Sequence, residues 1–195
     1  MSAGFLSVLS QAQRYVSERA RSGESVIDAT AGGGVDTLFL ARHVGEAGRV
    51  FAFDVQEEAL ARTSARLASA AASGERLASA DLLLAGHEEM TSRVPAEYHG
   101  RIAAVMFNLG YLPGAGQELT TQTDTTLIAL VAALLLLRSG GVLTIVVYPG
   151  HEGGDAEAAA VVEWSTSLPP SIGQCVMYRF PQKTASPYLI AVVKK

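Results

Sequence analysis

The stretch ESVIDATAGGG, residues 24–34, places an apolar run, an aspartate and three glycines in direct succession. The run at Glu24–Asp28 predicts a short buried strand, and the small residues Ala29–Gly34 predict a tight loop. From Val35 to His43 apolar residues return at helical spacing. The order of strand, glycine-rich loop and helix indicates a β-α unit.

A second unit follows directly. RVFAFD, Arg49–Asp54, predicts a strand, and Glu57 to about Ser73 predicts an alanine-rich helix that Gly74 ends. Two successive β-α units indicate a parallel sheet. Upstream of both, apolar residues at helical spacing predict an opening helix that ends near Gly23, and these residues are Leu6, Val8, Leu9, Ala12, Val16 and Ala20.

The rest of the chain continues the alternation. Three further strands are expected at Asp81–Leu84, Ile102–Phe107 and Val142–Tyr148, and helices at Thr121–Arg138 and Asp155–Ser167. Gln174–Phe180 and Tyr188–Val193 are expected to form a closing antiparallel hairpin. We therefore predict one α/β domain over residues 1–195, with a Rossmann-like, seven-stranded and mostly parallel sheet. The closing hairpin is typical of class I methyltransferases and is lacking in a plain dehydrogenase fold.

Composition narrows the protein class. The chain has 195 residues, of which 49% are apolar and 17% charged, which fits one folded domain and excludes a disordered chain. The single cysteine, Cys175, lies in an apolar run and is interpreted as core; it can form no internal disulfide, so a reducing cytoplasm is expected. The longest apolar run, Leu127–Leu137, is too short to span a bilayer. The apolar helix that contains it could form the interface of a homodimer.

The net charge of −4 argues against a large nonspecific nucleic-acid surface, because such binding relies on many lysines and arginines. The net charge does not exclude a small local patch of basic residues. We interpret the basic residues singly as solvated surface; they are Arg14, Arg19, Arg21, Arg62, Arg66, Lys183, Lys194 and Lys195.

The glycine loop fits a cofactor other than a dinucleotide. Glycines follow Asp28 at four and six residues, as in methyltransferases that use S-adenosylmethionine. They would let the backbone approach the methionine part, and Asp28 could bind its ammonium group. The dinucleotide fingerprint would need a third glycine where Thr37 stands.

Asp54 supports this interpretation independently. It ends the second strand, where a carboxylate can accept both hydroxyls of an adenosine ribose. A helix-capping role is the alternative. Gln56 is a weaker candidate near the ribose, and His87 and Glu88 follow the third strand, where the adenine is usually contacted. No spacing of histidine, cysteine and aspartate suggests a metal site.

The loop after the fourth strand, FNLGYLPG, indicates chemistry on an amine. Amino-group methyltransferases often carry Asn-Pro-Pro-Tyr here, in which the asparagine oxygen accepts an amine N–H and aims its lone pair at the methyl group. Asn108 and Tyr111 match this pattern, while Leu109 and Gly110 depart from it. An ordinary turn is the alternative.

A further loop, YPGHEGG, is expected on the same rim of the sheet. Tyr148 is a candidate for substrate binding. His151 could contact the methyl acceptor or take its proton, since the pKa of a histidine lies near 6.5.

Taken in order, the blocks DATAGGGVDTLFLA, FDVQ, GHE, FNLGYLPG, ELTTQTDTT and YPGHEGG resemble the MnmM/YtqB family, formerly labelled rRNA methylases. The resemblance runs from about Val26 to Gly154. It implies methyl transfer from S-adenosylmethionine to the exocyclic amine of 5-aminomethyluridine, or its 2-thio form, at the wobble position in the anticodon region of tRNA. Gly33 and Gly86 depart from the family, which often has a polar residue and a serine at these positions.

Together, these interpretations give two sets of site residues. The predicted cofactor set is Asp28, Ala29, Thr30, Gly32, Gly34, Asp36, Thr37, Asp54, Gln56, His87 and Glu88. The residues expected around the acceptor are Asn108, Tyr111, Pro113, Thr120, Thr121, Tyr148 and His151. A methyltransferase of ribosomal RNA or small amines would show the same cofactor loop, and a dinucleotide-dependent oxidoreductase is the alternative from another class.

Overall fold

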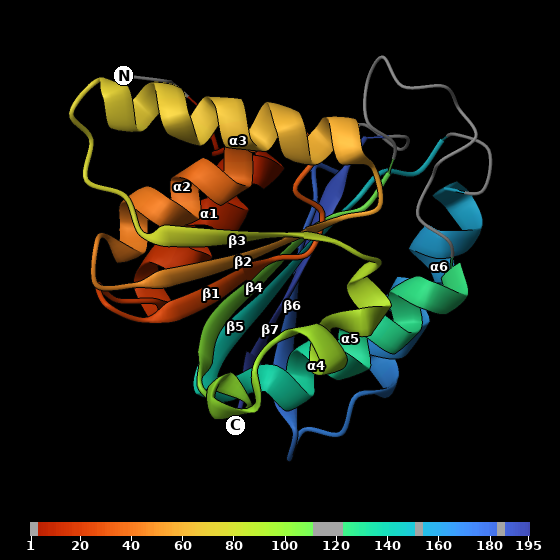
Figure 1. The fold of residues 1–195 in the computed structure, drawn as a ribbon. Coiled ribbons are helices and arrows are strands. Elements are labelled where there is room, and N and C mark those ends of the chain that lie inside the picture. The colour runs from red at the N-terminus through yellow and green to blue at the C-terminus, as the bar shows by residue number, and fades with distance from the viewer. Residues whose placement is uncertain (1–3, 111–122, 151–153, 183–185) are drawn as a thin grey trace.

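The computed structural model describes residues 4–110, 123–150, 154–182 and 186–195. Within these ranges, the chain folds into one seven-stranded sheet with the strand order β3-β2-β1-β4-β5-β7-β6 (Figure 1). The strands are β1 (Ser25–Asp28), β2 (Arg49–Asp54), β3 (Ser79–Leu84), β4 (Ile102–Asn108), β5 (Leu137–Val147), β6 (Gly173–Tyr178) and β7 (Tyr188–Lys194). The helices are α1 (Val8–Arg19), α2 (Val35–Val44), α3 (Glu57–Ala72), α4 (Met90–Arg93), α5 (Thr123–Leu136) and α6 (Gly154–Ser167), with short 3₁₀ turns η1 (His87–Glu89) and η2 (Ala96–Tyr98).

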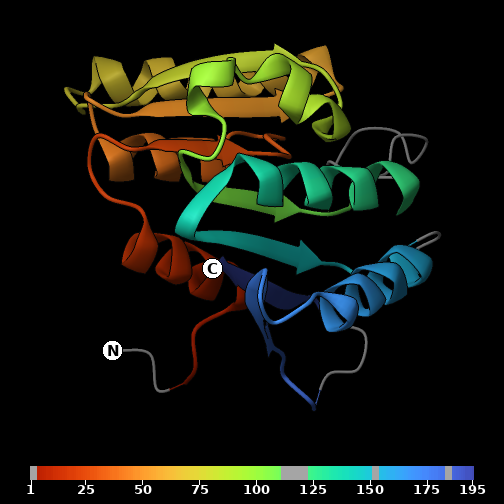
Figure 2. The same ribbon diagram turned by 90° about the horizontal axis from the view of Figure 1, so that it is seen from below.

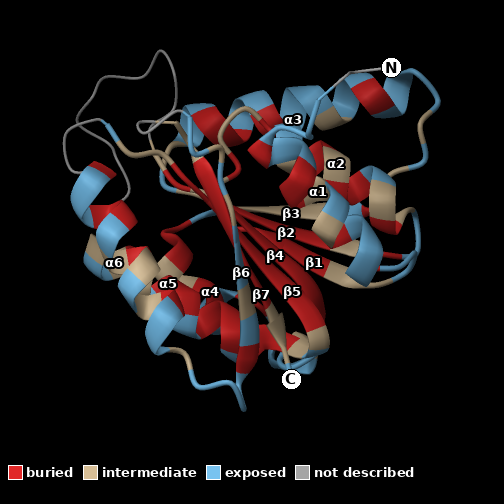
Figure 3. Ribbon diagram, turned by 180° about the vertical axis from the view of Figure 1, so that it is seen from behind, coloured by how far each residue is buried: buried red, intermediate tan, exposed pale blue. Residues whose placement is uncertain are grey.

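Helices cover both faces of this sheet. Helices α1, α2 and α3 lie on one face, and α4, α5 and α6 on the other (Figures 1 and 2). Successive strand residues enter opposite cores, because side chains alternate along a strand: Val26 packs in the α1–α2 core, and Ile27 packs in the α5–α6 core. The strands at the centre are therefore buried on both sides (Figure 3), as the continuous apolar runs predicted.

Sheet topology confirms the predicted fold class. Strands β1 to β5 run parallel in neighbouring pairs. Toward the edge of the sheet opposite β3, β7 pairs antiparallel with both β5 and β6. The predicted closing hairpin is present, and β7 is inserted between β5 and β6.

Strand β5 begins earlier than predicted. The sequence predicts one helix through Arg138, directly before Ser139, Gly140 and Gly141, but α5 ends at Leu136. Leu137 already pairs with Ile102, and regular pairing resumes at Val142 after an irregularity. The glycines thus lie inside the strand segment and do not end the helix.

The interpretation of Cys175 as core holds in part: its side chain is half-buried and packs against the α5–α6 core, whereas Val176 and Met177 are exposed, because β6 is the edge strand of the sheet. The predicted opening helix is present as α1, which begins at Val8 with Ser7 as its N-cap and ends at Arg19, before Gly23. Among the described residues, no helix is long and apolar enough to cross a membrane.

Candidate functional site

Asp28 ends β1 and is 1% exposed. Its Oδ1 accepts a hydrogen bond from the Thr30 backbone N–H at 3.1 Å, and its Oδ2 accepts one from the Thr37 hydroxyl at 2.6 Å. Burial, together with the charges of Asp36 and Asp54, raises the pKa of Asp28 to about 7 against the lowering effect of these hydrogen bonds. Thr37, which is itself fully buried, therefore fixes the orientation of the Asp28 carboxyl group.

Asp54, at the end of β2, holds the glycine loop. One oxygen of its carboxylate accepts the Gly32 backbone N–H at 2.8 Å, and the other accepts the Gln56 N–H at 2.9 Å. Each carboxylate oxygen can accept a second hydrogen bond, so two acceptor positions are left for hydroxyl groups. The N-cap of α3 is Gln56, with no side-chain capping bond, so Asp54 does not cap this helix and can serve a ligand.

The middle of the glycine loop is shaped by helix packing. Gly34 has φ +76°, and a Cβ there would lie 2.8 Å from the Thr63 Cα in α3. Gly34 therefore lets α2 and α3 approach closely, a requirement for glycine that is separate from the predicted approach of the cofactor. Gly33, in contrast, has open space around a Cβ, so the family's polar residue would fit there.

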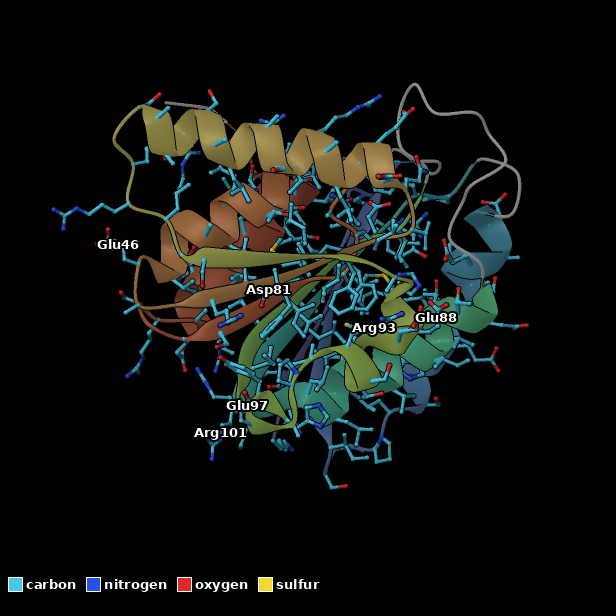
Figure 4. The ribbon with its side chains drawn as sticks, in the orientation of Figure 1. Glu46, Asp81, Glu88, Arg93, Glu97 and Arg101 are labelled. Atoms are coloured by element: carbon cyan, nitrogen blue, oxygen red, sulfur yellow. The ribbon has the colours of Figure 1, made fainter. Side chains whose placement is uncertain are left out.

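His87, which the sequence placed near the adenine, begins the 3₁₀ turn η1 and is buried. It is 8% exposed, its ring lies 5.5 Å from the ring of Phe107, and it hydrogen-bonds the Ala29 backbone. Burial lowers the pKa of His87, so the neutral ring is favoured. His87 and Ala29 thus tie η1 to the glycine loop. Glu88 lies toward the carboxyl ends of the strands, whereas Glu46 lies at the opposite end of the sheet (Figure 4).

Asn108 ends β4 beside the same loop. Its backbone N–H donates to the Thr30 hydroxyl at 2.8 Å, and its Nδ2 donates to the Asp36 carboxylate at 3.2 Å. Its Oδ1 is buried and has no hydrogen-bond partner among the described residues. A buried acceptor without a partner costs about 1–3 kcal/mol, so this oxygen indicates a missing donor, such as an N–H of a ligand.

Backbone pairing explains why Leu109 replaces the first proline of Asn-Pro-Pro-Tyr. Leu109 is fully buried, and its N–H donates to the Val146 carbonyl at 2.9 Å, which continues the pairing of β4 with β5. A proline has no N–H and could not make this bond. A Cβ at Gly110 would lie 3.7 Å from Cδ2 of the Tyr148 ring, so Gly110 packs against this ring.

Tyr148 follows β5 and faces the same group of residues. Its pKa is raised by burial and further by the charge of Asp36. The structure therefore brings together the glycine loop, the first turn of α2 and the ends of β4 and β5. Five predicted acceptor-site residues lie outside the described residues, namely Tyr111, Pro113, Thr120, Thr121 and His151.

Two contacts at this site were not predicted. Gln13 of α1 donates from Nε2 to Asp36 at 3.0 Å, and Thr63 of α3 donates from its hydroxyl to the Gly32 carbonyl at 3.2 Å. Both residues lie on helices far from the loop in sequence, and no motif marks them. Only the packing of α1 and α3 brings them to the site.

The residues fit S-adenosylmethionine. Asp54 retains acceptor capacity for ribose hydroxyls, and Asp28 and Asp36 supply negative charge for a ligand with an ammonium and a sulfonium group. Beside Asp54, Val55 is 58% exposed and Leu84 is 56% exposed, which leaves apolar surface for an adenine. No group of three or more potential metal ligands occurs in the part of the chain that the structure describes.

The fold and this site define a Rossmann-like methyltransferase, the class whose cofactor is S-adenosylmethionine. Residues 50–194 match the family described as "Putative rRNA methylase", and the chain belongs to this family. A solved structure described as a "putative rRNA-methylase" from Clostridium thermocellum is 34% identical, covers 98% of this chain and 100% of its own, and has a TM-score of 0.90.

Two further relatives are similar over most of the chain. A "putative methyltransferase" from Streptococcus mutans, solved in complex with SAH, is 32% identical, covers 98% of this chain and 100% of its own, and has a TM-score of 0.85. A tRNA (mnm(5)s(2)U34)-methyltransferase, chloroplastic, of Arabidopsis thaliana is 38% identical over 90% of this chain. The chain spans 65% of the length of this curated relative.

Proposed function

We propose that this enzyme N-methylates the aminomethyl group of 5-aminomethyluridine, or its 2-thio form, at the wobble position of tRNA. The observation that carries the proposal is the buried, unpartnered Oδ1 of Asn108 at the end of β4. An amine N–H is the donor that this oxygen lacks. The name of the Arabidopsis relative supports tRNA as the substrate and the modified wobble uridine as the site.

In this proposal, the protein acts mainly by orientation. When bound, S-adenosylmethionine supplies an electrophilic methyl group on a sulfonium. The Asn108 Oδ1 accepts one N–H of the amine, so that the nitrogen lone pair is aimed and the reaction gains from near-in-line geometry. The Thr30 hydroxyl fixes the backbone of Asn108, and the pairing of Leu109 with Val146 fixes the chain beyond it.

The amine needs a proton acceptor. A primary alkylamine is mostly protonated at neutral pH, and an ammonium ion has no lone pair. His151 or a water molecule is proposed to take this proton. Turnover should therefore rise with pH until the amine is largely neutral.

The alternative acceptors are ribosomal RNA bases and free small amines, because the cofactor half of the site would serve them equally well. A carbon acceptor on a base ring would need an added nucleophile, and no residue at the described site supplies one. The buried Thr37, bonded to Asp28 where a dinucleotide fingerprint needs glycine, argues against the oxidoreductase alternative. A cytoplasmic location stays a prediction that rests on the lone cysteine.

The proposal is tested with tRNA purified from cells that lack this activity. The enzyme is incubated with that tRNA and labelled S-adenosylmethionine, and digested nucleosides are identified by mass spectrometry. We expect the methylaminomethyl nucleoside, and none with tRNA that lacks the aminomethyl group. Label confined to ribosomal RNA or to free small amines would contradict the proposal.

A further inference from the structure

Asp36 lies in the first turn of α2, and its two carboxylate oxygens have different partners. Oδ1 accepts from Gln13 Nε2 at 3.0 Å, and Oδ2 accepts from Asn108 Nδ2 at 3.2 Å. Its charge also raises the pKa of both Asp28 and Tyr148. The sequence placed Asp36 in the cofactor set, but its contacts are with the residue that faces the acceptor.

We infer that Asp36 is the positioning residue for Asn108, and that Gln13 of helix α1 holds Asp36 in place. This inference rests on the proposed function, which gives the Asn108 oxygen its task. An amide side chain can turn over and exchange its oxygen and nitrogen, so its orientation is set by its neighbours. A carboxylate only accepts, so Asp36 requires the nitrogen of Asn108 to face it. The oxygen is thereby directed to the opposite side, where it has no protein partner.

Gln13 orients Asp36 as Asp36 orients Asn108. Gln13 gives Asp36 a donor on its other oxygen, which limits rotation of the carboxylate about its own axis. Helix α1 can serve as a fixed support, because Ala12 and Val16 are fully buried in the core that it shares with β4 and β5. The opening helix, which lies outside the β-α units, therefore contributes to the alignment of the methyl acceptor.

The first test removes only the charge. In Asp36→Asn, the new side chain carries a donor that can bind the Asn108 Oδ1 and occupy it. We expect at least a tenfold fall in turnover at saturating substrates, and a smaller loss of affinity for S-adenosylmethionine, because one of the negative charges near the cofactor is removed. A weaker Kd with unchanged saturated turnover would make Asp36 a cofactor residue and overturn the inference.

The second test is a double-mutant cycle on Gln13. Gln13→Leu keeps a similar volume and removes the donor, and we expect a threefold to tenfold loss of turnover. In the Asp36→Asn background, the same substitution should cost almost nothing, since the two residues act through one contact. Equal losses in both backgrounds would contradict the inference. Arg14→Gln, at the exposed neighbouring position on α1, is the matched control and should leave turnover unchanged.

A third readout does not depend on the acceptor. The side-chain amide protons of Asn108 can be followed by ¹⁵N NMR in the wild-type protein with S-adenosylmethionine. We expect slow exchange with solvent that becomes faster in Asp36→Asn and, to a smaller extent, in Gln13→Leu. Unchanged exchange would overturn the inference even if the tRNA is methylated, whereas faster exchange with no methylation of tRNA would refute the proposed function alone.

Discussion

At the scale of single residues, Asp28 shows how the site combines burial with charge. Its carboxyl group is enclosed at the end of β1, near the carboxylates of Asp36 and Asp54. Three acidic groups so close together store electrostatic repulsion that a cationic ligand would relieve. The site is thus suited to a ligand with positive charge.

The titration of Asp28 gives a prediction for stability. Its pKa is raised from 3.8 to about 7, first by burial and then by Asp36. Between these two pH values, the folded chain holds a proton that the unfolded chain has released. The contribution of Asp28 to stability therefore falls as pH rises through this window, by about 1.4 kcal/mol per pH unit, and is constant above it.

Asp28→Asn removes this titration. The free energy of unfolding of the variant, relative to the wild type, should increase from pH 5 to pH 7 and then level off. Urea unfolding at pH 5, 6, 7 and 8 measures it. A difference between the two proteins that does not change with pH would show that Asp28 is ionised throughout.

Asp54 gives a prediction for cofactor affinity. Asp54→Ala removes the acceptor for two hydroxyls, and each hydrogen bond to a charged group is worth about 1.5–3 kcal/mol. Calorimetry should show affinity for S-adenosylmethionine weakened at least about a hundredfold. Asp81→Ala is the control, because Asp81 lies on β3 and pairs with Arg49. Equal affinities in the two variants would refute the ribose assignment.

Sequence reasoning found the residues that end strands and missed those that support them. Asp28, Asp54 and Asn108 could be predicted because each follows a clear apolar strand, and parallel strands end at one edge. Gln13 and the bond between Asp36 and Asn108 could not, because they depend on how α1 packs across the sheet.

At the scale of elements, the close approach of α2 and α3 depends on Gly34. Gly34→Ala would need an unfavourable φ of +76° and would bring a Cβ against the backbone of Thr63. We expect a loss of at least about 2 kcal/mol, from the positive φ and the backbone contact together. Urea unfolding of the apo protein measures this change.

Gly33→Ala is the matched control for this substitution. Its Cβ would meet nothing within 4 Å, so stability should change by less than about 0.5 kcal/mol. Similar losses in both variants would show that the loop, and not the helix contact, sets the requirement for glycine.

The strand β5 shows the limit of local patterns. Leu127–Leu137 is a continuous apolar run, and periodicity does not show where such a helix ends and a buried strand begins. The pairing of Leu137 with Ile102 sets that boundary, and Ile102 lies on a different strand. The insertion of β7 beside β5 is non-local in the same way.

At the scale of the whole molecule, most arginines of the described chain are paired with acids. Seven of the twelve arginines form such pairs, which are Arg14–Glu18, Arg42–Glu75, Arg49–Asp81, Arg62–Glu58, Arg76–Glu46, Arg93–Glu89 and Arg138–Glu24. A groove of about 680 Å³ between α2 and α3 is lined by Arg42, Arg62 and Arg66. With a net charge of −4, few cations are left for RNA phosphates.

We therefore predict a shallow salt dependence of tRNA binding. Six to ten phosphate contacts would weaken affinity by about 10³–10⁵ between 50 and 200 mM salt. Fluorescence anisotropy over this range should show a fall of less than about a hundredfold. A steeper fall would reveal a basic surface that these ion pairs do not suggest.

The surface of α5 bears on oligomeric state. Ile128, Val131 and Leu135 are more than half exposed and follow one another at helical spacing. A homodimer through this helix stays a prediction, which sedimentation of the wild type and of Leu135→Glu would test.

In the proposed reaction, the free oxygen of Asn108 aims an acceptor amine at the methyl group. Asn108→Ala tests it most directly, in single-turnover methylation of aminomethylated tRNA alongside calorimetric titration with S-adenosylmethionine. We expect affinity for the cofactor to be preserved while the rate falls at least about a hundredfold, because the lost contact acts chiefly on the way to the transition state. A variant that methylates at the wild-type rate would contradict it, since Asn108 would then be only a residue of the turn after β4.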